Sequence, residues 1–147
     1  MRAADIPVAH TPPGGYGETM PAPVLTGCTE PLVDGAPDMR GTWRIVSVSE
    51  GADHMLGHVQ RIEQCGDRVV VTSGGVVHDM RCNGTEADGV HDVNPHGMEI
   101  HVVATFEAGV HVLRPIGMPV EVRRWLEGDE LLWDYAGMFV ARLARTD

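Results

Sequence analysis

The sequence predicts an all-β fold, in which eight to ten antiparallel strands follow one another up and down and close into a barrel. Three observations support this prediction. Short runs alternate apolar and polar side chains, which is the period of a half-buried strand. Glycine-containing turns separate these runs at close spacing, and no run has a convincing helical period. At 147 residues the chain is long enough for one domain with a real core.

The first 40 residues are expected to form an N-terminal arm, distinct from a barrel domain at residues 41–147. Seven of the ten prolines lie in this segment, charge is sparse, and no strand or helix period holds. The arm could lie along the outer surface as a tail, close the barrel as a lid, or dock on a second subunit of a homodimer. Some cover is expected because one outward row of the barrel is unusually apolar, with Val103, Leu113, Trp125 and Leu132.

Ten runs in the barrel domain are candidate strands. The first five are residues 42–49, 58–64, 68–72, 76–82 and 90–93. The second five are residues 98–106, 110–116, 120–127, 130–135 and 138–145. The segment from Ser49 to Gly57 could be a loop or a single helical turn. The pattern leaves open whether Ala136-Gly137 bends the last strand or reverses it, so nine or ten strands are expected.

The turns between residues 98 and 135 determine which side chains should face the interior. A three-residue loop at Glu107-Ala108-Gly109 would pair Phe106 with Val110. A second three-residue loop is expected at 117–119, and a two-residue turn at Gly128-Asp129. With these turns the inward face holds Met98, Ile100, Val102, Ala104, Phe106, Val110, Val112, Arg114, Ile116, Val120, Val122, Arg124, Leu126, Leu131, Trp133 and Tyr135.

Two arginines on this otherwise apolar face are the main candidates for function. In the expected register Arg124 lies opposite Val112 and diagonal to Arg114, with the arginine β-carbons about 7–8 Å apart. Trp133 lies directly across from Arg124. Two guanidinium groups beside aromatic rings predict a pocket for a mostly apolar ligand with one acidic end. The alternative is that both arginines lie at a barrel end and reach solvent.

The other candidate residues each have a structural alternative. Tyr135 could polarise a ligand carbonyl, or it could be a core tyrosine. Trp133 could stack on an unsaturated ligand or belong to the core. His78 is the only inward titratable candidate, although a satisfied interior histidine is the commoner case. The expected binding residues are Arg114, Trp133, Phe106, Val112, Val122 and His78, and the expected catalytic residues are Arg124 and Tyr135.

No metal or cofactor is predicted. The chain has eight histidines, but His54 and His58 lie on a glycine-flanked segment that is unlikely to form a stable helix. His101 and His111 fall on the outward face in the expected register. No phosphate loop, dinucleotide fingerprint or nucleophile elbow is present, and none of the three cysteines has an activating context.

Charge and cysteine content limit the partners and the compartment. The chain has 21 acidic residues against 11 basic ones, all arginine, which argues against nucleic acid and anionic membranes as partners. It has no apolar run of membrane-spanning length, and its first residues lack the apolar centre of a signal peptide. An odd number of cysteines without a C-x-x-C pair argues against a disulfide framework and for a reducing cytoplasm.

The start of the first strand resembles a known superfamily. Gly41-Thr42-Trp43, the up-and-down meander and the arginines of the last strand are similar to the calycin superfamily, which includes lipocalins and fatty-acid-binding proteins. The resemblance implies that Trp43 packs under Arg142 or Arg145 at the closed end of the barrel. The second lipocalin motif, Thr-Asp-Tyr, is replaced by Trp133-Asp134-Tyr135. The helix pair of fatty-acid-binding proteins has no room between Ser49 and His58.

The layout, a small barrel with an N-terminal segment, is also similar to lipocalin-like cyclases of bacterial polyketide pathways. The leading functional prediction is a barrel that binds a hydrophobic, weakly acidic small molecule in its interior, and we favour its use as a cofactor-free, pericyclic-type cyclase or isomerase of a polyketide-like natural product. Arg114 and Arg124 would hold the acidic group, and Tyr135 would polarise it. A different class of function is the non-catalytic carriage of a fatty acid or a similar lipophilic ligand. A third is a fully packed stability or interaction domain.

Overall fold

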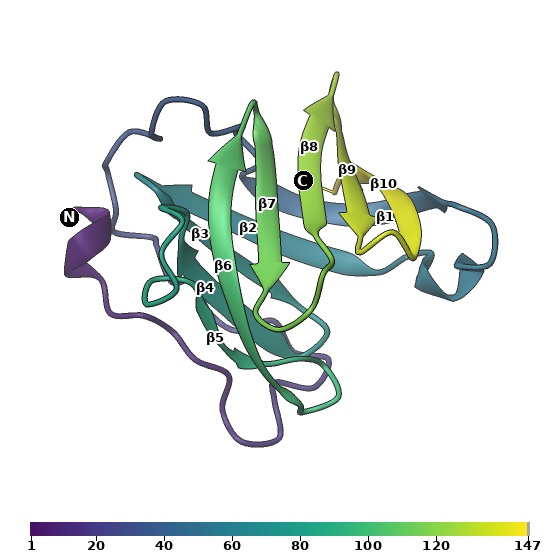
Figure 1. Ribbon diagram of the computed structural model, residues 1–147, viewed down its shortest axis with the longest axis horizontal. Helices are drawn as coiled ribbons and strands as arrows, with labels where there is room; N and C mark the ends of the chain where they lie inside the picture. Colours follow the sequence, from purple (N-terminus) through teal and green to yellow (C-terminus); the bar gives the residue numbers. More distant parts are fainter. Residues whose placement is uncertain (147) are drawn as a thin grey trace.

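The computed structural model describes residues 1–146, and its ten antiparallel strands form one curled sheet (Figure 1). The strands are β1 (Gly41–Val48), β2 (Val59–Cys65), β3 (Arg68–Ser73), β4 (Val76–Arg81), β5 (Val90–Val93), β6 (Glu99–Glu107), β7 (Val110–Pro115), β8 (Val122–Glu127), β9 (Glu130–Tyr135) and β10 (Phe139–Arg145). Two three-residue 3-10 helices, η1 (Ala3–Asp5) and η2 (Asp53–Met55), complete the described elements. The prediction of an all-β, up-and-down barrel is confirmed, and Ala136-Gly137 reverses the chain between β9 and β10.

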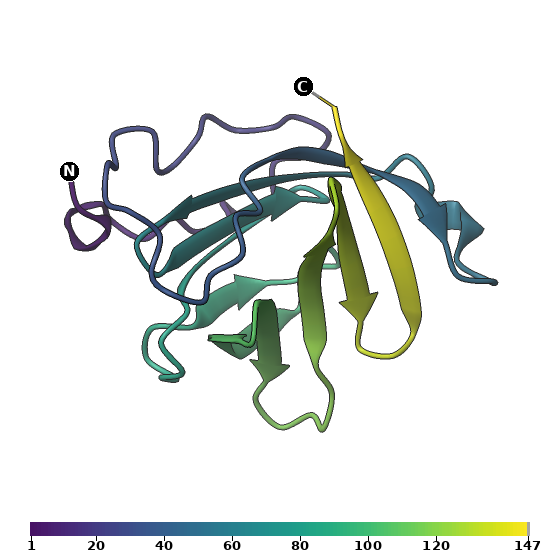
Figure 2. The same ribbon diagram turned by 90° about the horizontal axis from the view of Figure 1, so that it is seen from above.

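The barrel is nearly closed, because the first and last strands pair and the two edge strands come together. The sheet order is β4-β3-β2-β1-β10-β9-β8-β7-β6-β5, so β4 and β5 are its edges. These edges meet through His78, whose Nε2 lies 2.8 Å from the Val93 carbonyl oxygen, and through the Arg81 amide, which donates to the Asp88 carbonyl. The curl that brings them together is visible in both ribbon views (Figures 1 and 2).

One end of the barrel carries the arrangement that the resemblance implies. Trp43 is fully buried, and its indole Nε1 donates to the Met39 carbonyl oxygen at 2.9 Å. The guanidinium carbon of Arg145 lies 4.2 Å from the centre of the Trp43 ring. Of the two candidate arginines it is therefore Arg145 that covers the tryptophan, while Arg142 lies on the outer surface and pairs with glutamates.

The N-terminal arm packs along the outside of the barrel, over β2, β3 and β4 (Figure 2). A second apolar cluster forms there, separate from the interior, from the buried Leu25, Cys65, Val70 and Val77 with Ile6, Ala9, Tyr16, Val24 and Cys28. Beneath the arm, the buried Arg68 pairs with Asp79 and also donates to the carbonyl oxygens of Ala3, Ile6 and Pro7. In this structure the arm therefore lies against the outer surface of its own barrel.

A disulfide joins this arm to the barrel, and it corrects the prediction from cysteine number. Cys28 of the arm is bonded to Cys65 at the end of β2, and the third cysteine, Cys82, is free and buried. The odd count misled because one cysteine is simply a small core residue. Disulfides persist mainly in oxidising environments, so the cysteine count no longer supports a cytoplasmic location, which stays a prediction. No helix within residues 1–146 is long and apolar enough to cross a membrane.

The β6–β7 hairpin differs from the prediction by one residue. Glu107 pairs with Val110, so the turn contains only Ala108 and Gly109, with φ angles of 51° and 79°. Positive φ at both central residues is typical of the two-residue type I′ turn, which matches the twist of the strands better than the expected loop. Phe106 therefore pairs with His111 rather than with Val110.

A one-residue change of register turns a strand over. Val112 and Arg114 consequently lie on the outer face of β7, and the prediction that they point inward is wrong. His111 and Leu113 point inward instead, so Leu113 does not belong to the expected outer row. The arm covers β2, β3 and β4 and not that row, so the predicted reason for a cover is also wrong. The expected register of β8 and β9 is confirmed, including the pairs Arg123–Asp134 and Arg124–Trp133.

Candidate functional site

Most of the barrel interior is apolar. Its wall is formed by side chains from nearly every strand, among them Ile45, Ile62, Val69, Val71, Met80, Val90, Val102, Ala104, Phe106, Leu113, Val122, Leu126, Leu131 and Leu143. Inward positions of β2, β7, β8 and β9 interrupt this wall with polar or amphipathic groups. These are the residues that could recognise a ligand, because polar groups fix the orientation of a molecule in an apolar site.

Arg124 is the centre of this polar group. Its side chain comes from β8, and the residue is 5% exposed. Its Nε donates to the Oε1 atom of Gln60 at 3.2 Å, and Gln60 lies on β2, which is separated from β8 by three strands in the sheet order. Its guanidinium carbon lies 5.0 Å from the centre of the Trp133 ring, within cation–π range. Across residues 1–146 no carboxylate pairs with this arginine, and Gln60 is its one hydrogen-bond partner.

Burial therefore disfavours the charge of Arg124. Removal of the guanidinium from water lowers its pKa to about 10, while the nearby Tyr135 acts in the opposite direction. The group remains a cation at neutral pH. Arg68, another deeply buried arginine, differs because its hydrogen-bond donors are satisfied by Asp79 and three carbonyl oxygens.

His111 lies directly opposite Arg124 on the neighbouring strand β7, and it is fully buried. Burial, and then the positive charge of Arg124, lower the pKa of His111 to about 3, so its ring is neutral at pH 7. Neither of its ring nitrogens has a hydrogen-bond partner within the described part of the chain. His58 repeats this pattern: its ring stacks on Trp133 at 5.9 Å, and burial lowers its pKa as well.

These residues present more hydrogen-bond donors than acceptors. Among residues 1–146, the buried Gln60 Nε2 and Trp133 Nε1 atoms donate to no acceptor, and each neutral histidine ring adds one N–H. The Nη groups of Arg124 make no hydrogen bond with residues 1–146 either. Buried donors normally have acceptors, so this group is suited to a partner rich in oxygen acceptors, such as a carboxylate or an enolate.

The structure brings several of the predicted site residues together. Arg124, Trp133, Val122 and Phe106 all lie on the inner face. Tyr135 lies on the same face but is partly exposed; its ring stacks on Phe139 at 5.4 Å and meets Trp133 edge-on at 5.5 Å.

His78 also faces inward, but its Nε2 lies 2.8 Å from the Val93 carbonyl oxygen at the β4–β5 edge. Burial lowers the pKa of His78 below its ordinary value. The contacts of His78 therefore match the alternative, an interior histidine whose hydrogen bond is satisfied by the protein.

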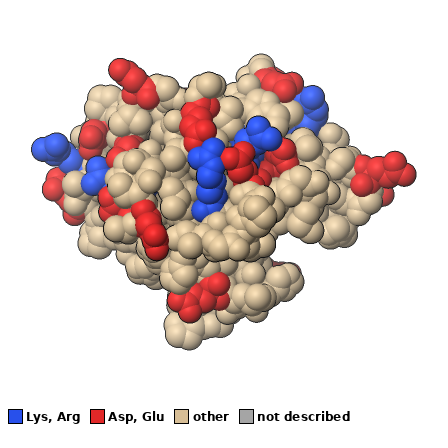
Figure 3. Space-filling model, viewed as in Figure 1, with Lys and Arg blue, Asp and Glu red and all other residues tan. Residues whose placement is uncertain are grey.

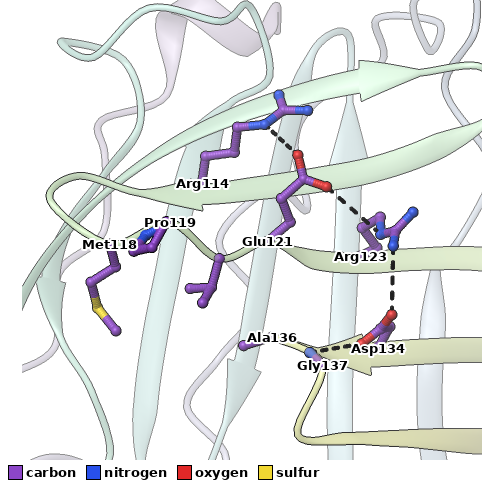
Figure 4. A pocket seen from close by; sticks show the side chains of 9 residues that line it. Arg114, Met118, Pro119, Glu121, Arg123, Asp134, Ala136 and Gly137 are labelled. Atoms are coloured by element: carbon purple, nitrogen blue, oxygen red, sulfur yellow. Dashed lines mark hydrogen bonds and ion pairs between the residues drawn. The ribbon is translucent and has the colours of Figure 1, made fainter.

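Arg114, by contrast, lies outside the barrel with ion-pair partners of its own. Its side chain is 42% exposed, its Nε donates to Glu121 at 2.7 Å, and its Nη1 pairs with Glu107 at 2.5 Å. These two carboxylates raise the pKa of Arg114. Figure 4 shows how the ion pairs continue through Glu121 to Arg123 and Asp134. The basic side chains on the face in Figure 3 likewise lie beside acidic ones, so no free basic patch appears there.

Two hollows lie on the outer surface, and neither is lined by Arg124. The first, of about 530 Å³, is the groove of Figure 4 beside Arg114, Met118 and Asp134. The second, of about 270 Å³, lies between the arm and β4. The charged residues of the first groove are already paired with one another. Arg124, in contrast, has no carboxylate partner within residues 1–146, and several polar groups near it lack acceptors. The interior group is therefore the better candidate site.

Gln60, His58 and His111 were missed by reasoning from the sequence. The inward position of His111 could have been found if Ala108-Gly109 had been interpreted as a two-residue turn, since that register pairs His111 with the inward-facing Phe106. Gln60 and His58 carry no local signal, because their approach to Arg124 and Trp133 depends on closure of the barrel.

Solved structures that are similar to this chain include the following three. Human cRBP IV matches with a TM-score of 0.59 and 17% identity, covering 74% of this chain and 98% of the other. Zebrafish ileal bile acid-binding protein, complexed with cholic acid, gives a TM-score of 0.57, 16% identity and coverages of 73% and 98%. Fatty-acid-binding protein 1 of Echinococcus granulosus gives a TM-score of 0.55 and 16% identity, and the match covers 74% of this chain and 98% of the other. No protein-family model and no curated protein sequence matches this chain.

The chain therefore shares the β-barrel fold of these three proteins, in agreement with the resemblance of its first-strand motif. At 16–17% identity this likeness establishes the fold and leaves the function to be argued from the site.

Proposed function

We propose that this barrel is a non-catalytic carrier of a hydrophobic small molecule with an acidic group, and that the acidic group binds Arg124. The single observation that carries this proposal is a buried arginine without an anion among surrounding donors that lack acceptors. The apolar interior would hold the rest of the molecule, with Trp133, Phe106 and Val122 among the residues in contact with it.

The energetics favour a ligand with an anion. A pKa lowered from 12.5 to about 10 means that the folded protein disfavours the charged form of Arg124 by about 3 kcal/mol. A carboxylate would restore that loss, because its two oxygens can accept several charge-assisted hydrogen bonds at once. The Nη groups of Arg124 and the free N–H groups of Gln60 and Trp133 would supply those bonds.

The structural neighbours agree with this class of ligand. One neighbour holds cholic acid, an apolar body with a carboxylate, and another is a fatty-acid-binding protein. The same class of molecule would suit this interior on the chemistry of its own residues.

The cyclase prediction has weaker support. Catalysis by proton transfer works best with a group whose pKa lies near the working pH. Burial lowers the pKa of His111 to about 3, well below such a pH, and it also lowers the pKa of His58. Tyr135 would have to polarise the substrate without such a base, so binding is the function that this arrangement supports best.

Native mass spectrometry of protein purified without detergent tests the proposal. The wild type should carry a co-purified acid, or take up added oleate at one equivalent. Arg124→Met should lose at least tenfold in oleate affinity, and Arg114→Met, which changes a surface arginine, should match the wild type. Equal oleate binding by all three proteins would overturn the proposal, as would no binding by the wild type.

A further inference from the structure

A pair of histidines on the outer surface has an arrangement unrelated to the interior site. His91 of β5 and His101 of β6 are directly paired across the two strands. Their ring centres are 5.0 Å apart, and the two Nδ1 atoms approach to 2.7 Å. The His101 side chain is 45% exposed, so small ions in solution can reach the pair.

The hydrogen bonds of the other ring nitrogens determine what the two Nδ1 atoms carry. Nε2 of His91 lies 2.8 Å from the Glu86 carbonyl oxygen, and Nε2 of His101 lies 2.8 Å from a carboxylate oxygen of Glu99. Both oxygens can only accept, so each Nε2 must hold the ring proton. A neutral imidazole has one N–H, which leaves a lone pair on each Nδ1, and the two lone pairs face each other.

Two facing lone pairs at 2.7 Å require a positive centre between them. A metal ion can provide it without adding a proton to either ring. With metal–nitrogen bonds of about 2.05 Å, the 2.7 Å separation gives a nitrogen–metal–nitrogen angle of about 82°. That angle is close to the right angle between neighbouring ligands in square-planar or octahedral geometry, and far from the tetrahedral angle preferred by Zn²⁺.

We propose that His91 and His101 form a two-histidine site for Cu²⁺ or Ni²⁺ on the outer face of the β5–β6 hairpin. Both rings bind through Nδ1, and water completes the coordination. Residues 1–146 contain no cluster of three or more His, Cys, Asp or Glu side chains arranged for a metal, so the protein supplies two ligands. Glu99 and the Glu86 carbonyl act as positioning groups, because each holds the Nε2 proton and directs the opposite lone pair towards the metal.

The place of the pair in the fold suggests what a bound ion would do. β5 contains only four residues, Val90–Val93, and forms one edge of the nearly closed sheet. An ion held by one histidine from β5 and one from β6 would tie this short edge strand to its long neighbour. Amide hydrogen exchange in β5 should therefore slow when Ni²⁺ is added.

Calorimetric titration of the tag-free, full-length protein with Cu²⁺, Ni²⁺ and Zn²⁺ tests the proposal. One equivalent of Cu²⁺ should bind, and Ni²⁺ should bind at least as tightly as Zn²⁺. His91→Ala and His101→Ala should each weaken Cu²⁺ binding at least tenfold, and Glu99→Gln should weaken it about tenfold. His96→Ala is the matched control, since it removes an exposed histidine from the turn of the same hairpin and should bind as the wild type does.

Electron paramagnetic resonance of the 1:1 Cu²⁺ complex gives a second measurement, and coupling to two imidazole nitrogens is expected. Circular dichroism shows whether each variant keeps the barrel fold. Wild-type affinity in both His91→Ala and His101→Ala would overturn the proposal, because Cu²⁺ would then bind elsewhere. Tighter binding of Zn²⁺ than of Cu²⁺ and Ni²⁺ would contradict the assigned geometry.

Discussion

Removal of the buried charge at the interior site should make the ligand-free protein more stable. The change is the double variant Arg124→Met, Gln60→Leu, which replaces both partners of the hydrogen bond with apolar side chains of similar size. A single substitution would leave Gln60, which is 0% exposed, with an unsatisfied acceptor. The double variant avoids that penalty, and it also removes the Gln60 Nε2 donor, which has no acceptor within residues 1–146.

The lowered pKa of Arg124 corresponds to about 3 kcal/mol against the charged form in the folded state. Loss of the cation–π contact with Trp133 offsets about 1–2 kcal/mol of this. We therefore expect the free energy of unfolding to rise by about 1–2 kcal/mol, in line with other replacements of buried charges by apolar groups.

The assay is urea unfolding of delipidated protein, followed by circular dichroism. Arg68→Met is the matched control, because Arg68 is just as buried, at 2% exposure, but is paired with Asp79. Its removal leaves a buried carboxylate alone and should cost about 3–5 kcal/mol. If the Arg124 double variant lost as much stability as Arg68→Met, Arg124 would be a structural residue and the reasoning would be refuted.

Three further predictions concern stability. His111→Leu should weaken the pH dependence: the His111 pKa is about 3 when folded and 6.5 in its ordinary state, so stability falls as pH drops below 6.5, by about 3 kcal/mol from pH 7 to pH 4. Reduction of the Cys28–Cys65 disulfide, which spans 37 residues, should lower the free energy of unfolding by about 4 kcal/mol in the chain-entropy model. Ala108→Asn should raise it by about 0.5–1 kcal/mol, because asparagine tolerates the positive φ of a type I′ turn.

Urea unfolding measures all three. For His111 the free energies of unfolding of wild type and variant are compared at pH 4 and pH 7. An equal loss of stability in both proteins between pH 7 and pH 4 would contradict a buried neutral His111 ring. For the disulfide, Cys28→Ser is the control, since added reductant should not change the stability of this variant. If reductant left the free energy of unfolding of the wild type unchanged, the disulfide would not contribute to stability. Lower stability of Ala108→Asn would argue against the two-residue turn.

The fold could be predicted from sequence because its signals are local. Period-two alternation placed all ten strands within about two residues, and Gly41-Thr42-Trp43 indicated the barrel fold that the structural neighbours share. The turn at Gly128-Asp129 gave the correct register of β8 and β9. Two register errors arose. The turn at Ala108 is one residue shorter than expected, because alanine at positive φ is uncommon and the sequence favoured a longer loop. The expected loop at 117–119 is also wrong by one residue, since Val112 pairs with Arg123 and not with Arg124; the two shifts cancel, so Arg124 faces inward as predicted.

The site was predicted less completely, for two physical reasons. The turn error exchanged the faces of β7, so Arg114 was placed inside the barrel and His111 outside it. The approach of Gln60 to Arg124 depends on β2 and β8 facing each other across a nearly closed sheet, and no local pattern encodes that. The disulfide could not be predicted for the same reason, since Cys28 meets Cys65 only when the arm folds back on the barrel.

The most direct test of the carrier proposal compares two fluorescent probes that differ in charge. 1-Anilinonaphthalene-8-sulfonate carries an anion, and N-phenyl-1-naphthylamine is its uncharged counterpart. The account predicts that the wild type prefers the anionic probe, and that the Arg124→Met, Gln60→Leu variant loses at least tenfold in affinity for it while its affinity for the neutral probe stays the same. An unchanged preference for the anionic probe in the variant would show that Arg124 does not bind the acidic group.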